Sequence, residues 1–271
     1  EGQLNGHSFG NIFIAALVGI GGDFYRGVEA AGELLAIRGR VIPSTLSNVT
    51  LVGSTVSGET LIGESRVGNS SDRLRSLTLI PANPAAHPEA VRAIEDADMV
   101  VIGPGSLFTS IAPNLLISDI SAALAGSPAF KVYVCNVAEE PAQTEGYSVL
   151  DHLNIVRHYG GESSIDAVLA NRNVPGGETP AGLDFIRANN PWEDDVILVE
   201  ADVIDETDNT STARHDPVKL SNAIAEAYRK YRGRRQRLPR IRINLGLNRP
   251  GNGRPVLNGN GESQPLPVQE K

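Results

Sequence analysis

The sequence predicts an α/β protein: a Rossmann-like three-layer sandwich with a mainly parallel sheet and a small antiparallel β excursion over residues 41–81. Short apolar runs that are typical of buried strands alternate with amphipathic helical patterns. Two of these runs, 99–102 and 131–137, are joined by a helical pattern, which predicts a parallel βαβ unit. Residues 41–81 instead hold three β-rich runs without a helical pattern, and we expect them to cover an edge of the main sheet.

The predicted βαβ unit contains the clearest boundary signals between elements in the chain. The run 99–102 (MVVI) ends abruptly in residues 103–106 (GPGS), as a strand followed by breakers does. Pro113 can open a helix at its first turn. The next apolar residues recur at the spacing of one helix face: Leu116, Ile120, Ala123 and Leu124.

The other elements follow from the same patterns. A two-residue hairpin signal, Ser57-Gly58, separates the first two β-rich runs. Further helices are predicted at 12–18, 23–38, 88–96, 148–159 and 218–231, and further strands at 49–56, 59–65, 74–80, 165–170 and 196–203.

Composition excludes several classes of protein. The chain has 271 residues, of which 41% are hydrophobic and 21% charged, as in ordinary globular domains. No apolar run approaches the ~20 residues that cross a bilayer, so we expect no membrane association. One cysteine cannot form a disulfide within the chain, and we expect a cytoplasmic protein. Cys135 could be a nucleophile, but its apolar neighbours favour a small buried core residue.

Charge is distributed unevenly along the chain. The net charge is −8, whereas residues 232–271 hold eight arginines, one lysine and two glutamates, which leaves an acidic body. We therefore predict one domain over residues 1–231 and a disordered basic tail over 232–271. An acidic body does not attract nucleic acid. The basic run 229–242 leaves RNA binding open for the tail alone, although a solvated tail is favoured.

Candidate ligand-binding residues lie where parallel strands end. The GPGS loop offers backbone N–H groups and a hydroxyl, which suit a phosphate, although a tight turn explains it equally well. The loop 138–147 follows the next strand and is expected beside it. Asp216 and Pro217 are explained as the cap and first turn of a helix, whereas Arg214 would stand at the helix mouth, able to bind an anion bidentately. Asp151 and His152 could do acid–base work, but adjacent helical residues point in different directions.

Four stretches in a fixed order carry a family resemblance: GHSFGN at 6–11, GPGSLFTSIAPNLL at 103–116 with VYVCN at 132–136, EPAQTEGYSVLDHL at 140–153, and RHDPVKL at 214–220. Over roughly residues 5–231 the chain resembles the CofD-like superfamily in its gluconeogenesis-factor (YvcK-like) branch. In the transferase branch the central loop reads GP-x-NP, so GPGSL favours the gluconeogenesis-factor branch. The family begins with a GGGTG-type loop and a DDGGSSG segment upstream of GHSFGN. We therefore expect this chain to lack the N-terminal part, with the first phosphate cradle and the aspartates best suited to a metal.

The resemblance implies a Rossmann-like fold, a cytoplasmic location and a regulatory protein that binds UDP-N-acetylglucosamine or a dinucleotide. Its expected role lies in central carbon metabolism, cell-wall precursor supply and cell shape. We expect no catalytic residue, metal or cofactor, and leave open a homo-oligomer. The alternative is a 2-phospho-L-lactate transferase of deazaflavin coenzyme biosynthesis, which would need magnesium and would draw on Asp151, His152 and Asp216. The expected ligand-binding residues are His7, Asn11, Gly103, Pro104, Gly105, Ser106, Thr109, Asn136, Glu145, Gly146, Tyr147 and Arg214.

Overall fold

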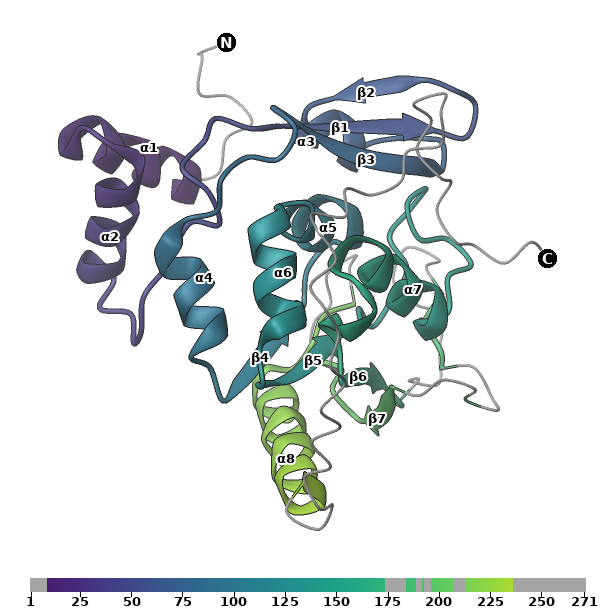
Figure 1. Ribbon diagram of the computed structural model, residues 1–271. Helices are drawn as coiled ribbons and strands as arrows, with labels where there is room; N and C mark the ends of the chain where they lie inside the picture. The colour runs from purple at the N-terminus through teal and green to yellow at the C-terminus, as the bar shows by residue number, and fades with distance from the viewer. Residues whose placement is uncertain (1–8, 174–183, 189–191, 193–195, 207–212, 236–271) are drawn as a thin grey trace, which may run out of the picture.

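A computed structural model describes residues 9–173, 184–188, 192, 196–206 and 213–235, with the side chains of Asn11 and of 232–235 outside the described part. It contains a four-stranded parallel sheet, in the order β4-β5-β6-β7, and a three-stranded antiparallel sheet, in the order β2-β1-β3 (Figure 1). The fold is therefore the α/β class that the sequence predicts. In chain order, the elements are α1 (Phe9–Gly21), α2 (Phe24–Leu34), β1 (Thr50–Thr55), β2 (Thr60–Ile62), α3 (Glu64–Gly68), β3 (Leu74–Ile80), α4 (Pro88–Glu95), β4 (Met99–Ile102), η1 (Leu107–Ile111), α5 (Ala112–Leu115), α6 (Ser118–Gly126), β5 (Phe130–Val134), α7 (Val149–Gly160), η2 (Glu162–Ser164), β6 (Ala167–Asn171), β7 (Ile197–Ala201) and α8 (Pro217–Arg235).

Strand β5 is buried on both faces, which is why its sequence is almost entirely apolar. Its one charged residue, Lys131, is also buried, and its ammonium group donates to the Ser127 carbonyl at 3.3 Å. Alternate side chains enter two separate cores. Tyr133 and the following Cys135 pack on one side of the sheet, and Phe130, Val132 and Val134 pack on the other. This period of two defines a middle layer between two helical layers.

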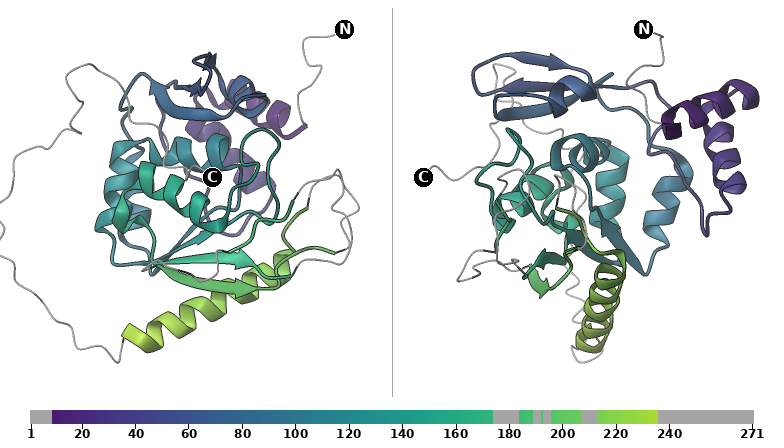
Figure 2. Two further views of the ribbon diagram at one scale, coloured as in Figure 1. Left: turned by 90° about the vertical axis from the view of Figure 1, so that its right-hand side faces the viewer. Right: turned by 180° about the vertical axis from the view of Figure 1, so that it is seen from behind.

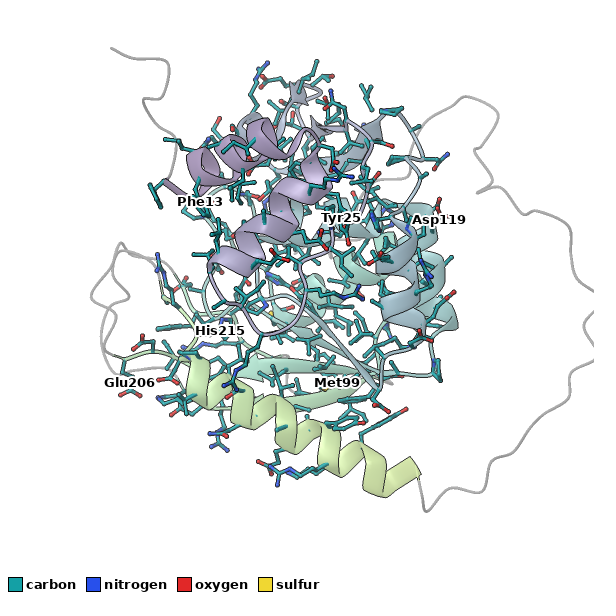
Figure 3. All side chains as sticks on the ribbon, turned by 90° about the vertical axis from the view of Figure 1, so that its left-hand side faces the viewer. Phe13, Tyr25, Met99, Asp119, Glu206 and His215 are labelled. Carbon is teal, nitrogen blue, oxygen red and sulfur yellow. The ribbon has the colours of Figure 1, made fainter. Side chains whose placement is uncertain are left out.

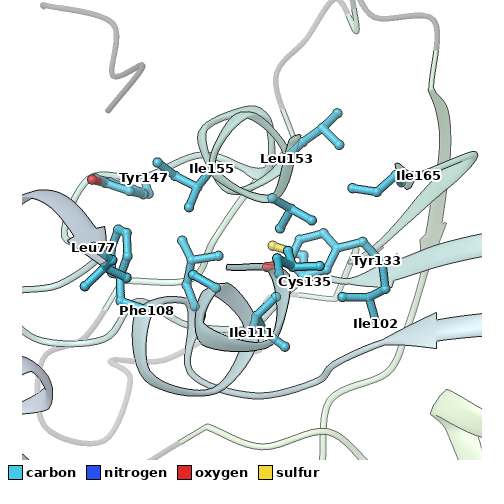
Figure 4. Packing of buried hydrophobic residues seen from close by; sticks show 14 of the residues in the cluster. Leu77, Ile102, Phe108, Ile111, Tyr133, Cys135, Tyr147, Leu153, Ile155 and Ile165 are labelled. Atoms are coloured by element: carbon cyan, nitrogen blue, oxygen red, sulfur yellow. The ribbon is translucent and has the colours of Figure 1, made fainter. Parts of the chain in front are cut away.

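The two helical layers differ in size. Helices α5, α6 and α7 cover one face of the parallel sheet, and α8 crosses the other (Figure 2). Tyr231 of α8 stacks on Phe130 at 4.3 Å between ring centroids. On the opposite side, Figure 4 shows Tyr133 and Cys135 packed beneath Leu153 and Ile155 of α7.

The antiparallel sheet lies on the helical layer. Its buried side chains join the core that α5 and α7 share, and the Leu77 N–H donates to the Tyr159 hydroxyl at 3.0 Å. The expectation that this sheet covers an edge of the parallel sheet is therefore wrong. The Ser57-Gly58 hairpin is confirmed. The predicted second strand is too long, because Gly63 adopts a φ of 98° and α3 begins directly after it.

The helix predicted from Pro113 is broken into several pieces. Residues 107–111 form a π-helical turn, α5 follows, and Ile117 is extended before α6 begins. The two halves meet at 77°. Periodicity did not reveal this bend, since the apolar residues continue at helical spacing across it. Leu116, which that spacing places on the buried face, is only half-buried, and its neighbours Leu115 and Ile117 are buried instead.

Helices α1 and α2 form a hairpin at the side of the body (Figures 1 and 3). They cross closely at Gly27, where an added Cβ would lie 2.5 Å from a Val18 methyl. Tyr25 connects α2 to the body through its ring, 4.9 Å from that of His87, and its hydroxyl, 3.3 Å from a Glu89 carboxylate oxygen.

No single helix among the described residues is long and apolar enough to cross a membrane. Only the bent pair Leu107–Leu115 and Ser118–Gly126 reaches that length and composition, and most of its apolar side chains belong to the core. Helix α8 continues to Arg235, four residues beyond its predicted end. The predicted tail from residue 236 onward lies outside the described residues.

Candidate functional site

The GPGS loop turns sharply away from the end of β4. Gly103 has a φ of +84°, and a Cβ there would lie 3.2 Å from the Val134 carbonyl oxygen and 3.3 Å from Ile111. A Cβ on Gly105 would lie 3.1 Å from that of Ser110. Gly103 is therefore required by its positive φ and by the Val134 carbonyl, whereas a side chain at Gly105 would have to displace that of Ser110. The loop is thus closely packed against β5 and η1.

We expect Gly103→Ala to lower the free energy of unfolding by about 1–2 kcal/mol, since an L-residue is strained at this φ and its methyl group has no room. Urea unfolding followed by circular dichroism measures the change. Gly126→Ala is the matched control, because a Cβ there meets nothing within 4 Å. Equal stability of the two variants would contradict the strain at Gly103.

A cavity of about 970 Å³ opens beside this loop. Four segments form its wall: residues 68–71 after α3, 104–106 after β4, 136–143 after β5, and 213–215 before α8. Two of them follow neighbouring parallel strands, which is where open α/β sheets bind ligands. The connection between α3 and β3 and the segment before α8 contribute the other walls.

Five of the predicted residues line this cavity together: Pro104, Gly105, Ser106, Asn136 and Arg214. Gly103 lies directly behind the loop and shapes it. Thr109 is half-buried in η1, with its methyl group facing Gly68 on the neighbouring wall. The residues after two strands and before one helix thus meet as predicted.

The segment 145–147 does not line the cavity, and its side chains have structural contacts. Tyr147 is 4% exposed and meets Phe108 and His152 edge to face. Glu145 accepts the Ala142 N–H at 3.1 Å. These residues therefore anchor the loop 139–142, because the chain turns back into the core directly after that loop.

The Gly146 N–H likewise donates to a Glu139 carboxylate oxygen at 2.9 Å. His7 lies outside the described residues. Asn11 belongs to α1, which packs on α2, and no described residue of α1 lines the cavity. The expected closure by the first helix is therefore not seen in the described part.

The two candidate acid–base residues, Asp151 and His152, have structural roles. Asp151 forms a capping box with Ser148, accepting both its N–H at 2.8 Å and its hydroxyl at 2.7 Å. His152 is fully buried in the core beneath α7, where burial lowers its pKa to about 4. Cys135 is also fully buried, and burial raises the pKa of its thiol, which confirms it as a core residue.

The segment that carries Arg214 is held by backbone hydrogen bonds on both sides. The Asp205 N–H donates to the Arg214 carbonyl at 2.9 Å, and the Asp216 N–H donates to the Val203 carbonyl at 2.8 Å. His215 Nε2 lies 3.2 Å from the Cys135 carbonyl oxygen, at the end of β5. Burial lowers the pKa of His215, so its imidazole is neutral near pH 7.

The wall also contains acidic and amide groups that the sequence reasoning did not select. Glu139 and Glu140 follow β5, and Gln143 donates to the Gly68 carbonyl at 2.9 Å, which joins two walls. The sequence signal that could have identified them is their position in the loop 138–147, which follows a predicted strand. Burial raises the pKa of Glu140, partly offset by the Leu107 N–H and the Ser106 hydroxyl. No cluster of three or more metal-ligating side chains occurs among the described residues.

The fold and the cavity define an α/β protein with an open cavity at the carboxyl ends of a parallel sheet. Residues 1–207 match the family of 2-phospho-L-lactate transferase CofD, and the chain belongs to this family. A Nostoc sp. protein named "Putative gluconeogenesis factor" is 40% identical over 236 residues, covering 83% of this chain and 51% of its own. The Bacillus subtilis gluconeogenesis factor is 36% identical over 169 residues, covering 62% and 53%.

The fold is shared with a solved structure. The crystal structure of a UPF0052 family member from Bacillus halodurans has a TM-score of 0.75 at 32% identity, covering 83% of this chain and 74% of its own. The chain spans about half the length of the Nostoc and Bacillus subtilis relatives.

Proposed function

We propose that this chain binds a nucleotide sugar, UDP-N-acetylglucosamine, in the cavity beside the GPGS loop and acts as a cytoplasmic regulator. Its field of action would be central carbon metabolism, cell-wall precursor supply and cell shape. The observation that carries the proposal is that the GPGS backbone and Arg214 line the same cavity from different segments. Its relatives' names point to the same branch of the family.

The loop and Arg214 suit the diphosphate. No described hydrogen bond uses the backbone N–H groups of Gly105 and Ser106, and these can donate to phosphate oxygens. Arg214 approaches from the opposite segment, and its planar guanidinium can bind two oxygens of one diphosphate. A cavity of about 970 Å³ is at the upper end of the range for small-molecule sites, as a two-part ligand requires.

Asn136 at the end of β5 would serve the sugar or the base. Its amide offers both donors and acceptors, which hydroxyl groups and nucleobase edges need. Under this proposal the chain performs no chemistry on its ligand. Its regulatory role comes from a difference between the liganded and unliganded surface around the cavity.

We expect Arg214→Ala to weaken UDP-N-acetylglucosamine binding on the order of tenfold or more, because a charge-assisted hydrogen bond contributes about 1.5–3 kcal/mol. Isothermal titration calorimetry with the wild type and the variant measures it. Arg75→Ala, which removes an exposed arginine from β3, is the control. Equal affinities for wild type and Arg214→Ala would remove Arg214 from the site, and the absence of wild-type binding would refute the proposed ligand.

The second candidate is a phospholactyl transferase, favoured by the description of the matching family. Asp216 is the acid nearest the cavity in its loop, but its carboxylate caps α8 by accepting the Val218 and Lys219 N–H groups, each at 2.8 Å. Incubation with magnesium, nucleotide-activated phospholactate and a deazaflavin acceptor separates the two functions. Product formation would replace the regulatory proposal.

A further inference from the structure

The side chain of Glu140 reaches across the cavity wall to the GPGS loop. Its Oε2 accepts the Leu107 N–H at 3.3 Å, and its carboxylate lies beside the Ser106 hydroxyl. The Ser106 Oγ is buried and has no hydrogen bond of good geometry among the described residues. A carboxylate of the chain itself therefore lies at the loop expected to hold a phosphate.

The backbone around Glu140 is fixed, so this placement is not that of a freely moving side chain. Its N–H donates to Thr144 Oγ1 at 2.8 Å, and its carbonyl accepts the N–H groups of Gln143 and Thr144 at 3.1 and 3.0 Å. Only the side-chain torsions can move the carboxylate. A carboxylate and a phosphate both present anionic oxygens to N–H and O–H donors. Glu140 accepts the Leu107 N–H, which directly follows the Gly105 and Ser106 N–H groups assigned to the phosphate, so a phosphate at the loop would meet this carboxylate at adjacent donors.

Several charged or titratable groups face Glu140. Tyr133 lies beneath it in the core, and Glu139 precedes it in the loop; Arg214 and His215 lie on the facing wall of the same cavity. No ion pair of Glu140 occurs among the described residues. A second anion bound at the loop would therefore meet an uncompensated negative charge, and this opposes binding while Glu140 is ionised.

We propose that Glu140 is an internal competitor of the ligand. In the unliganded protein its carboxylate lies against the GPGS loop, where it accepts the Leu107 N–H. A ligand phosphate binds at this loop only when the Glu140 side chain rotates away or is protonated. The inference rests on the proposed function, because it assigns the phosphate of that ligand to this loop. It makes Glu140 the residue that limits the affinity of the site.

We expect Glu140→Gln and Glu140→Ala to bind UDP-N-acetylglucosamine roughly tenfold more tightly than the wild type, the order expected when a competing hydrogen bond to a charged group is removed. Glu139→Gln is the matched control. It removes the same charge from the same wall, but the Glu139 carboxylate accepts from Gly146 and not from Leu107. Calorimetry should give a change of about twofold or less for this control, because the Glu139 carboxylate is held by the Gly146 N–H and does not take the donor that Glu140 takes.

The pH dependence provides a second readout. Protonation of Glu140 rises as the pH falls, so wild-type affinity should increase from pH 7.5 to pH 5.5, and this increase should shrink in Glu140→Gln. Protonation of His215 would also raise the affinity as the pH falls. The pH dependence of affinity that remains in Glu140→Gln measures the contribution of His215. Circular dichroism at each pH verifies that the variants stay folded.

The outcomes separate this inference from the proposed function. Wild-type binding with unchanged or weaker binding by both Glu140 variants would overturn the inference and leave the function intact. If UDP-N-acetylglucosamine binds to no variant, pyrophosphate is titrated into the wild type and Glu140→Ala. Binding by Glu140→Ala alone supports the competing carboxylate with a different ligand, whereas binding by neither overturns both proposals.

Discussion

Replacing Phe108 by alanine is expected to lower the free energy of unfolding by about 3–5 kcal/mol. The ring is fully buried in the core shared by η1, α7 and the antiparallel sheet, and it meets Tyr147 edge to face at 6.3 Å between centroids (Figure 4). Deleting it loses the transfer free energy of the ring and leaves a cavity that the rigid π-helical turn cannot close. Urea unfolding measured by circular dichroism gives the change.

Phe24→Ala is the matched control for this prediction. Phe24 begins α2 and is 52% exposed, so its loss should cost less than about 1 kcal/mol. A similar small cost at Phe108 would contradict the packing of η1 beneath the antiparallel sheet. A large cost would show that the segment following the GPGS loop is fixed by the core and not by the ligand.

The second prediction with a large effect is a loss of folding stability at acidic pH. His152 is fully buried, and burial lowers its pKa from 6.5 to about 4. Its Nδ1 lies 3.0 Å from the Ser148 carbonyl oxygen. Its Nε2 is buried and has no hydrogen-bond partner among the described residues, so a proton added there would bring a positive charge into the core. The folded protein therefore holds this imidazole neutral over a pH range in which the unfolded chain is protonated.

The sign of the effect follows from the bound protons. Above pH 6.5 both states are neutral at His152, and the group contributes fully. As the pH falls from 6.5 to about 4, the unfolded state binds more protons, so stability is lost. The loss due to this group should be roughly 2 kcal/mol at pH 5 and should approach roughly 3 kcal/mol below pH 4.

Urea titrations between pH 7.5 and pH 4.5 test this loss. In His152→Gln the dependence on pH should be weaker by that amount, whatever the overall stability of the variant. His158→Gln removes a histidine on the exposed side of the same helix and should keep most of the wild-type dependence. An identical pH dependence in wild type and His152→Gln would show that the buried imidazole does not titrate as inferred.

The sequence predicted best what local patterns determine. Strand β4 begins and ends where its apolar run does, and the Ser57-Gly58 hairpin stands where predicted. The helix after Pro113 was predicted as one piece, because the spacing of apolar residues continues across the extended Ile117. A bend changes the direction of a helix without changing which residues are apolar, so no periodicity reports it.

The site was predicted in part for a similar reason. The order of strands and loops brings Ser106, Asn136 and Arg214 to one edge of the sheet, and this follows from topology. Whether a loop side chain faces the cavity or the core depends on tertiary packing. Tyr147 therefore turned inward, while Glu140, in the same loop, faces the GPGS backbone.

The hydrogen bonds on both sides of Arg214 bear on the rate and the entropy cost of the ligand binding proposed above. Because its backbone is paired with the segment after β7, binding need not order a loop, and only the side-chain torsions lose freedom. Such preorganisation raises affinity without adding a contact. Weakening the pairing of residues 203–205 with 214–216 should thus slow association and reduce affinity, although none of the atoms that touch the ligand would have changed.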